Sequence, residues 1–194
     1  KVGLLAREAA TLRLLKPDTN LPSFSSILYP PPIENSMIQA SESPNGIILV
    51  TGPTGSGKSS TLHALVREIR DDTKRIITIE DPVEQELYFA TQVQINNKVG
   101  LTFSKALRNS LRQDPEIILV GEIRDKETCE IAVSASITGH LIISTLHTNS
   151  ALESFGRLVD LGMKPQDFIN TIRGVNAQRL LQCLCKSCNI EVFQ

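Results

Sequence analysis

Four short apolar runs, rich in β-branched residues, restrict the fold of this 194-residue sequence more than any other feature. They are GIILVTG, RIITIE, EIILVGE and HLIISTL, and they begin at Gly46, Arg75, Glu116 and His140. Their apolar residues are consecutive, as in strands that are buried on both faces. Segments with helical spacing lie between them, and TQVQINN adds a less buried strand. Strands that alternate with helices predict a mostly parallel α/β sheet flanked by helices.

The sequence before Gly46 differs in character. Residues 26–45 are rich in Pro, Ser and Asn, and we expect the three prolines at 30–32 to lie outside helices and central strands, which predicts a linker. Residues 1–25 are interpreted as the tail of a preceding domain, and 46–194 as the main domain. Because the chain begins with Lys1 and shows no signal peptide, we expect a fragment of a longer protein.

Composition narrows the classes of function. The sequence is 41% hydrophobic and 21% charged, which predicts a globular core. A net charge of −1 weakly disfavours a duplex-binding protein, and no apolar run approaches the ~18–20 residues of a membrane-spanning helix. Four cysteines are too few for a disulfide framework, so a reducing compartment is expected.

The stretch GPTGSGKS, residues 52–59, fits the phosphate-loop pattern G-x-x-x-x-G-K-[ST]. It follows an apolar strand and opens a helical segment, which is the context that such a loop needs. Its glycines allow backbone N–H groups to converge on phosphate oxygens. Lys58 is expected to reach the β- and γ-phosphates, and Ser59 to offer its hydroxyl to Mg²⁺. The expected nucleotide contacts in this stretch are Gly52, Pro53, Thr54, Gly55, Ser56, Gly57, Lys58, Ser59 and Ser60.

Acidic residues end two of the apolar runs, although the usual Mg²⁺-binding Asp is absent. One run ends in Gly121 and Glu122, and another in Glu80 and Asp81. Because ligands of open α/β sheets lie outside the carboxyl ends of strands, we expect Glu80, Asp81 and Glu122 to meet the nucleotide. They would support Mg²⁺ through water or act as general base, and the sequence leaves open which glutamate is the base. The alternative, a polar turn that merely closes a strand, has more weight for Glu84 than for Glu80.

Together these blocks resemble the secretion ATPases of type II secretion and type IV pilus assembly. The likeness runs from about Gly46 to about Cys188 and rests on GPTGSGKSS, TIEDPVE, GLTFSKALRNSLRQDPEIILVGEIRD, TGHLIISTLHTNSA and GVNAQRLLQCLC. The resemblance implies a RecA-like P-loop ATPase domain that uses ATP and Mg²⁺ and works as a hexamer. It also implies a cytoplasmic motor that acts on inner-membrane secretion or pilus platform proteins.

Other functions stay open as alternatives. A pilus retraction ATPase belongs to the same family. A RecA-like nucleic-acid motor is disfavoured by the near-zero net charge, and a nucleotide-binding scaffold without turnover by the intact acidic and phosphate-loop residues.

Two of the three histidines flank one apolar run. His140 and His147 should lie roughly 20 Å apart on an extended strand, so they cannot share a metal ion. The resemblance implies that His147 senses or positions the γ-phosphate, with Thr145 as a possible hydroxyl partner. His140 is either a structural cap or a functional residue. His63 is predicted to be a partly exposed packing residue.

Several arginines are candidates for phosphate contacts. Arg108 and Arg112 lie four residues apart on one helix face, which by itself fits a solvated basic surface. The resemblance implies that both contact phosphate, and that Arg13 reaches the nucleotide from the preceding domain. Arg124 is expected to pair with Asp125 or Glu122.

Cys185 and Cys188 have the spacing of half a tetrahedral zinc site. The resemblance implies a second pair beyond Gln194, so zinc is expected only in a longer chain. It also implies an assembly or secretion motor rather than a retraction motor. Cys183 and Cys129 are predicted to be packing residues.

Overall fold

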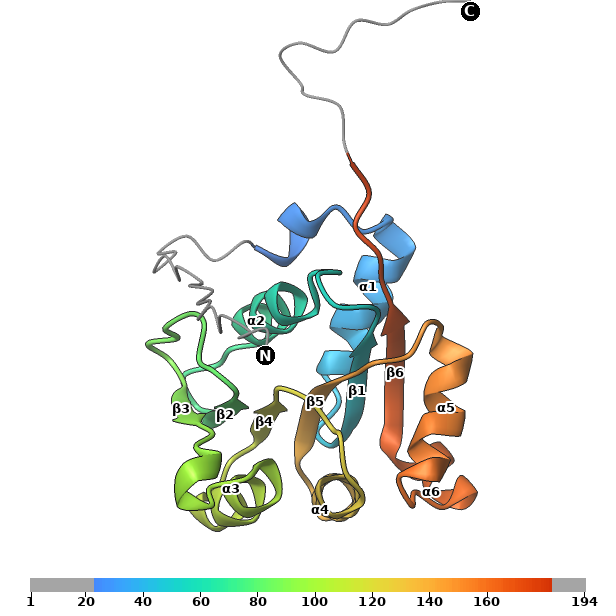
Figure 1. Ribbon diagram of the computed structural model, residues 1–194. Coiled ribbons are helices and arrows are strands. Elements are labelled where there is room, and N and C mark those ends of the chain that lie inside the picture. The colour runs from blue at the N-terminus through green and yellow to red at the C-terminus, as the bar shows by residue number, and fades with distance from the viewer. Residues whose placement is uncertain (1–22, 183–194) are drawn as a thin grey trace, which may run out of the picture.

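The computed structural model describes residues 23–182, and its centre is a single six-stranded sheet (Figure 1). The strand order is β3-β2-β4-β5-β1-β6, and all five pairings between neighbouring strands are parallel. The strands are β1 (Gly46–Thr51), β2 (Ile76–Glu80), β3 (Thr91–Gln94), β4 (Ile117–Val120), β5 (Leu141–Leu146) and β6 (Ile172–Ala177). The predicted parallel α/β architecture is confirmed.

Helices cover both faces of this sheet (Figure 1). One face carries η1 (Phe24–Ile27), α1 (Pro31–Ser41) and α2 (Lys58–Glu68). The other carries α3 (Phe103–Ser110), α4 (Lys126–Ile137), α5 (Ala151–Asp160) and α6 (Pro165–Thr171). Two short 3-10 helices, η2 (Asn97–Val99) and η3 (Leu111–Gln113), flank α3. Within the described residues, no helix combines the length and the hydrophobicity needed to cross a bilayer.

Alternate residues of each central strand pack into two separate cores. In β1, Ile48 and Val50 pack with Leu62 and the rest of the α2 face, whereas Ile47 and Leu49 join the core beneath α3 and α4. All six residues of β1 are buried. A strand buried on both faces has no polar side to alternate with, which explains the consecutive apolar runs.

The segment predicted to be a linker contains a helix. α1 begins at Pro31, has Pro32 in its first turn, and buries Met37 in the core on the α2 face. The expectation that these prolines lie outside helices was wrong, because the first N–H groups of a helix have no acceptor within it and proline loses nothing there. The division of the chain into domains stays a prediction.

The sequence did not predict strand β6. Its residues IRGVNA include Arg173, Gly174 and Asn176, so the run is not continuously apolar. β6 is nevertheless an edge strand, paired with β1 through contacts such as Val50 with Asn176. This pairing brings the residues after β6 to the loop that follows β1.

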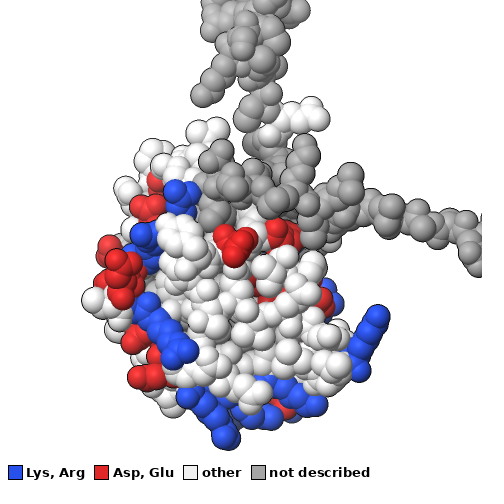
Figure 2. All heavy atoms as spheres, turned by 90° about the vertical axis from the view of Figure 1, so that its left-hand side faces the viewer, with Lys and Arg blue, Asp and Glu red and all other residues white. Residues whose placement is uncertain are grey.

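The side of the molecule at β3 carries mixed charge. Figure 2 shows mainly Lys and Arg side chains along its lower rim, Asp and Glu side chains interspersed with Lys and Arg along the left rim, and a largely uncharged centre with acidic side chains above it. The described residues on this face therefore form no broad surface of one sign, in keeping with the small net charge of the chain.

Candidate functional site

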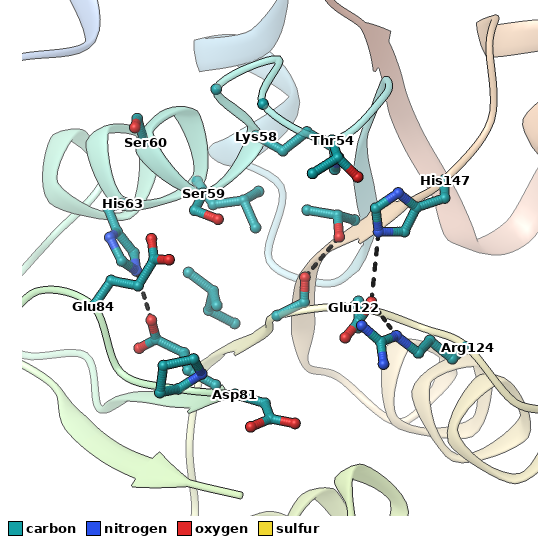
Figure 3. A pocket seen from close by; sticks show the side chains of 18 of the residues that line it. Thr54, Lys58, Ser59, Ser60, His63, Asp81, Glu84, Glu122, Arg124 and His147 are labelled. Atoms are coloured by element: carbon teal, nitrogen blue, oxygen red, sulfur yellow. Dashed lines mark hydrogen bonds and ion pairs between the residues drawn. The ribbon is translucent and has the colours of Figure 1, made fainter. Parts of the chain in front are cut away.

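A cavity of about 530 Å³ lies where four parallel strands end (Figure 3). Its walls come from the loop after β1, from α2, and from the residues that follow β2, β4 and β5. Parallel strands bring their carboxyl ends to one edge of a sheet, and so residues distant in sequence meet here. The predicted site residues Lys58, Ser59, Glu80, Glu122 and His147 all line this cavity.

The loop of residues 52–57 shapes the upper wall of the cavity. Gly57 has a φ of 83° and precedes α2, and no side chain caps the N-terminus of that helix. The N–H groups of the first turn of α2 therefore have no side-chain acceptor and are available to a ligand. Thr54 and Gly55 are exposed on the loop and also line the cavity, as does Ser60 in the first turn.

Lys58 follows this loop directly, as the first residue of α2. Its Nζ donates hydrogen bonds to the carbonyl oxygens of Gly52, at 2.9 Å, and Pro53, at 3.0 Å. Burial lowers the pKa of Lys58 below its ordinary value, although the charge of Glu122 acts in the opposite direction. The ammonium of Lys58 is partly dehydrated and is held by neutral carbonyl groups. Its hydrogen bonds become stronger when an anion replaces these carbonyl partners.

Glu80 is held by several neighbours. Its Oε2 lies 2.8 Å from Nε2 of His63, and its Oε1 accepts hydrogen bonds from Thr78 at 2.6 Å and Gln92 at 3.1 Å. Burial raises the pKa of Glu80, but the hydrogen bond and charge of His63 outweigh it and the net pKa is lowered. Both oxygens of this carboxylate therefore already have protein partners.

His63 is buried, and the prediction of a partly exposed packing residue was wrong. Burial lowers the pKa of His63, but its hydrogen bond and ion pair with Glu80 outweigh this effect and the net pKa is raised. The side chain also approaches Gln85, with 3.3 Å between Nδ1 and Oε1. This pair could not be predicted from sequence spacing, because α2 and the end of β2 meet only in the folded sheet.

Glu122 faces the cavity from the end of β4 with one oxygen unoccupied. Its Oε2 pairs with Nε of Arg124 and lies 3.6 Å from Nε2 of His147, as Figure 3 shows. Its Oε1 has no hydrogen-bond partner in the part of the chain that the structure describes. The predicted pairing of Arg124 with Glu122 is confirmed.

The two histidines that flank β5 lie beyond opposite ends of that strand. His147 is half exposed at the cavity, whereas His140 places its Nδ1 3.0 Å from the carbonyl oxygen of Ala135 before the strand begins. This contact supports a structural role for His140. Thr145 lines the cavity but donates its hydroxyl to the carbonyl oxygen of Gly121 at 2.7 Å, not to His147.

The remaining predicted residues divide into three groups. Asp81 and Glu84 line the cavity. Arg108 and Arg112 are exposed and are not among the lining residues, and NH2 of Arg108 instead bonds to Oε1 of Glu127 at 2.9 Å. These two arginines therefore lie outside the lining of the cavity in this chain, and their phosphate contacts stay a prediction. The last group lies outside the described residues: Arg13, Cys183, Cys185 and Cys188.

Cys129 is a core residue, as predicted. Its side chain is buried in α4, and burial raises the pKa of its thiol to about 11. A thiol with so high a pKa carries almost no thiolate at neutral pH and is chemically inert.

Two residues after β6 also contact the site, although no sequence motif assigns them a role. Gln178 is buried against the loop after β1, and its Nε2 donates to the carbonyl oxygen of Ser56 at 2.7 Å. Arg179 donates to the carbonyl oxygen of Asn149 at 2.8 Å and lowers the pKa of Lys58 through its charge. Both lie in the block GVNAQRLLQCLC, which carries part of the resemblance, but spacing within that block indicates no role for either residue.

The chemistry of the site suits a nucleotide with a hard divalent cation. Within the described residues, no group of three or more His, Cys, Asp or Glu side chains could hold a metal ion alone. Mg²⁺ needs no such group, since it binds through one or two protein oxygens, water and the phosphates of its substrate. The exposed Ser59 hydroxyl at the start of α2 is such an oxygen, and Glu80, Asp81 and Glu122 stand on the opposite wall.

A glycine-rich loop between the first strand and helix of a parallel sheet, with a lysine at its end, defines a P-loop nucleotide-binding domain. The family model described as type II/IV secretion system protein matches residues 2–194. The chain therefore belongs to this family, which the sequence motifs had predicted.

Individual relatives agree with this assignment. The chain is 55% identical to the type II secretion system protein E of Pseudomonas aeruginosa over 145 residues, which are 75% of this chain and 29% of the relative. It is 45% identical to the type IV pilus assembly ATPase PilB of Thermus thermophilus over 185 residues, 95% of this chain and 21% of PilB. The chain thus spans less than a third of the length of these relatives.

A solved structure shows the same fold. The crystal structure of the pilus retraction motor PilT with bound ADP matches with a TM-score of 0.76 and 37% sequence identity. The match covers 86% of this chain and 50% of PilT.

Proposed function

We propose that this domain binds ATP in the cavity and hydrolyses it, as the motor part of a protein-secretion or pilus-assembly machine. The observation that carries the proposal is the convergence of Lys58, the uncapped start of α2 and the half-free carboxylate of Glu122 on one cavity. The names of the relatives, a secretion protein and a pilus assembly ATPase, support the choice of machine.

The phosphate groups of ATP bind at the loop of residues 52–57. The N–H groups there and the N-terminal end of α2 face the anion, and Lys58 exchanges its two carbonyl partners for phosphate oxygens. Mg²⁺, when bound, neutralises charge on the β- and γ-phosphates, and Ser59 is the hydroxyl placed to hold it.

Glu122 is the better candidate for the general base. A base must accept a proton from the attacking water, so it needs an oxygen that is open to that water. Glu122 has such an oxygen, whereas both oxygens of Glu80 are engaged by His63, Thr78 and Gln92. Glu80 then acts as a fixed negative charge on the wall of the cavity, and Arg124 and His147 orient Glu122.

The positive charge for the transition state is incomplete within the described residues. Lys58 and Arg124 are the Lys and Arg side chains that line the cavity there, and Arg124 is already paired with Glu122. We infer that further arginines, of which Arg13, Arg108 and Arg112 are the candidates, contribute when subunits assemble into a hexamer. This arrangement fits a motor on the cytoplasmic side that acts on membrane platform proteins.

The pilus retraction alternative rests on the structural match to PilT. The sequence identity to PilT is 37%, lower than the 55% to the secretion protein of Pseudomonas aeruginosa. We therefore favour secretion or assembly.

Nucleotide titration of the full-length protein tests the binding step. Lys58→Ala should weaken Mg-ATP binding by about a hundredfold, because a charge-assisted hydrogen bond to phosphate is lost. Lys74→Ala is the matched control, since this exposed lysine precedes β2 at the edge of the sheet away from the cavity. Equal affinities of the two variants would refute the proposed site.

A further inference from the structure

Gln178 joins four parts of the chain that are distant in sequence. It follows β6, is 8% exposed, and its backbone N–H donates to the carbonyl oxygen of Thr51 at 2.9 Å. This bond extends the pairing of β6 with β1 into the start of the phosphate loop. The side chain of Gln178 thereby comes to lie beneath that loop.

Both ends of the Gln178 amide are used. Its Nε2 donates to the carbonyl oxygen of Ser56 at 2.7 Å, in the middle of the phosphate loop. Its Oε1 accepts from Oη of Tyr29 at 2.5 Å and from Oγ1 of Thr61 in α2 at 3.0 Å. Asn176 supports the same cluster, because its Nδ2 donates to Oη of Tyr29 at 2.7 Å.

The packing around Gln178 leaves no room for a side chain at Gly52. A Cβ atom on Gly52 would lie 2.5 Å from the carbonyl oxygen of Gln178 and 2.6 Å from Oγ of Ser56. The hydroxyl of Ser56 is itself buried and has no hydrogen-bond partner among the described residues. The carbonyl oxygen of Ser56 is therefore held by the Gln178 amide, whereas the hydroxyl of the same residue has no such partner among the described residues.

Tyr29 brings a different segment into this cluster. It lies between η1 and α1, ahead of the sheet, and its ring contacts Phe24 with 5.7 Å between centroids. Phe24 is buried in the core on the α2 face, so the segment is anchored there. The phenol of Tyr29 is therefore a fixed partner of the Gln178 amide rather than a loose surface group.

We propose that Gln178 is a positioning residue that holds the phosphate loop in its nucleotide-binding shape and ties that loop, through Tyr29, to the segment before α1. This inference rests on the proposed function, because it concerns the affinity of the same loop for nucleotide. Displacement of Tyr29 releases one partner of the amide and loosens its hold on Ser56. By linkage, nucleotide bound to the loop strengthens the Tyr29 contact by the same factor.

The test is an equilibrium titration of the full-length protein with a fluorescent Mg-ADP analogue. Gln178→Met keeps the length of the side chain but removes both the carbonyl oxygen and the NH2 group of the amide. It should weaken binding about tenfold. Tyr29→Phe removes one hydroxyl and should weaken binding about threefold. Gln182→Met is the matched control at an exposed position on the same segment, and it should bind like the unchanged protein.

The double variant separates positioning from general destabilisation. If Tyr29 acts through Gln178, the double variant should bind no more weakly than Gln178→Met alone. In the folded variants, kcat at saturating ATP should change less than the dissociation constant, since the loop contacts phosphate before and during the reaction. A merely structural role would lower Tm and leave the dissociation constant of the folded protein unchanged.

Two results would overturn the inference. One is binding by Gln178→Met that equals binding by Gln182→Met. The other is an unchanged affinity of Tyr29→Phe for the Mg-ADP analogue. This second result decides the matter if Gln178→Met does not fold. If the protein without substitutions bound no Mg-ADP at all, that result would instead contradict the proposed function itself.

Discussion

The buried pair of His63 and Glu80 makes the stability of the domain depend on pH. The pKa of Glu80 is lowered from 4.5, so its contribution is present above about pH 4.5 and is lost as the pH falls through the lowered value. The pKa of His63 is raised from 6.5, so its contribution is complete below pH 6.5 and is lost as the pH rises through the raised value. The pair therefore stabilises the fold most between these two ordinary pKa values, and Glu84 adds to it by raising the pKa of His63.

Replacement of His63 should remove this dependence. At pH 6, His63→Gln should lower the free energy of unfolding by about 2 kcal/mol, because a charge-assisted hydrogen bond in the interior is lost. At pH 8.5 the loss should be smaller, since the histidine of the unchanged protein is then closer to neutral. Urea unfolding at both pH values measures the difference, with His140→Gln as the control outside the pair. An equal loss at the two pH values would contradict the ion pair.

Single residues of the site were predictable where a local pattern carries the chemistry. Lys58 and Ser59 follow from the loop spacing, and Glu80 and Glu122 from their places after apolar strands. His63 and Gln178 could not be found in this way. The ring of His63 meets a carboxylate 17 residues away, and Gln178 meets Ser56 at a separation of 122 residues.

At the scale of elements, the phosphate loop tolerates no side chain at its first glycine. Gly52 has a φ of 151°, and a Cβ there would clash with the backbone of Gln178. Gly52→Ala should therefore weaken nucleotide binding by at least about tenfold while β1 and α2 persist. Nucleotide titration beside circular dichroism measures both properties. Unaltered affinity would show that the loop can shift away from β6.

Helix α5 contains a glycine with the opposite character. Gly156 is exposed in the middle of the helix, and a Cβ there would meet no atom within 4 Å. Gly156→Ala should stabilise the domain by about 0.5–1 kcal/mol, because alanine loses less backbone entropy in a helix. A Tm higher by about 1–4 °C is expected in thermal unfolding. A lower Tm would mean that this face of α5 contacts another part of the assembled protein.

The elements themselves were only partly predictable. The buried strands and the helices between them follow from consecutive apolar runs and helical spacing. α1 was missed because the prolines at 30–32 look incompatible with a helix, although Pro30 precedes the helix as its N-cap and Pro31 and Pro32 fit its first turn. β6 was missed because an edge strand is only partly buried and needs no continuous apolar run.

For the whole molecule, hydrolysis should depend on assembly. The cavity of one chain has Lys58 but few other free positive groups among its described residues, and a missing arginine costs roughly 10³–10⁵ in rate. Phosphate release per subunit should therefore rise with protein concentration as a hexamer forms. Rates measured across a wide concentration range, with particle size in parallel, check this. Full activity of a dilute monomer would show that one chain completes its own site.

Zinc binding should depend on the length of the chain, and its expected ligands Cys185 and Cys188 lie outside the described residues. A closed structural site needs four ligands, so a chain that ends at Gln194 should hold little zinc. A longer chain with a second cysteine pair should bind it tightly. Metal analysis of both chains decides this, and one zinc ion per short chain would contradict the expectation.

The most direct test of the account is phosphate release by Glu122→Gln in the full-length protein at saturating Mg-ATP. The rate should be about 10²–10⁴-fold below that of the protein without substitutions, with nucleotide affinity preserved, because the amide cannot accept a proton from water. Glu116 directly precedes β4, at the end of the strand opposite to Glu122. Glu116→Gln is the matched control and should hydrolyse ATP normally. Hydrolysis by Glu122→Gln at the rate of this control would contradict the assignment of Glu122 as the general base.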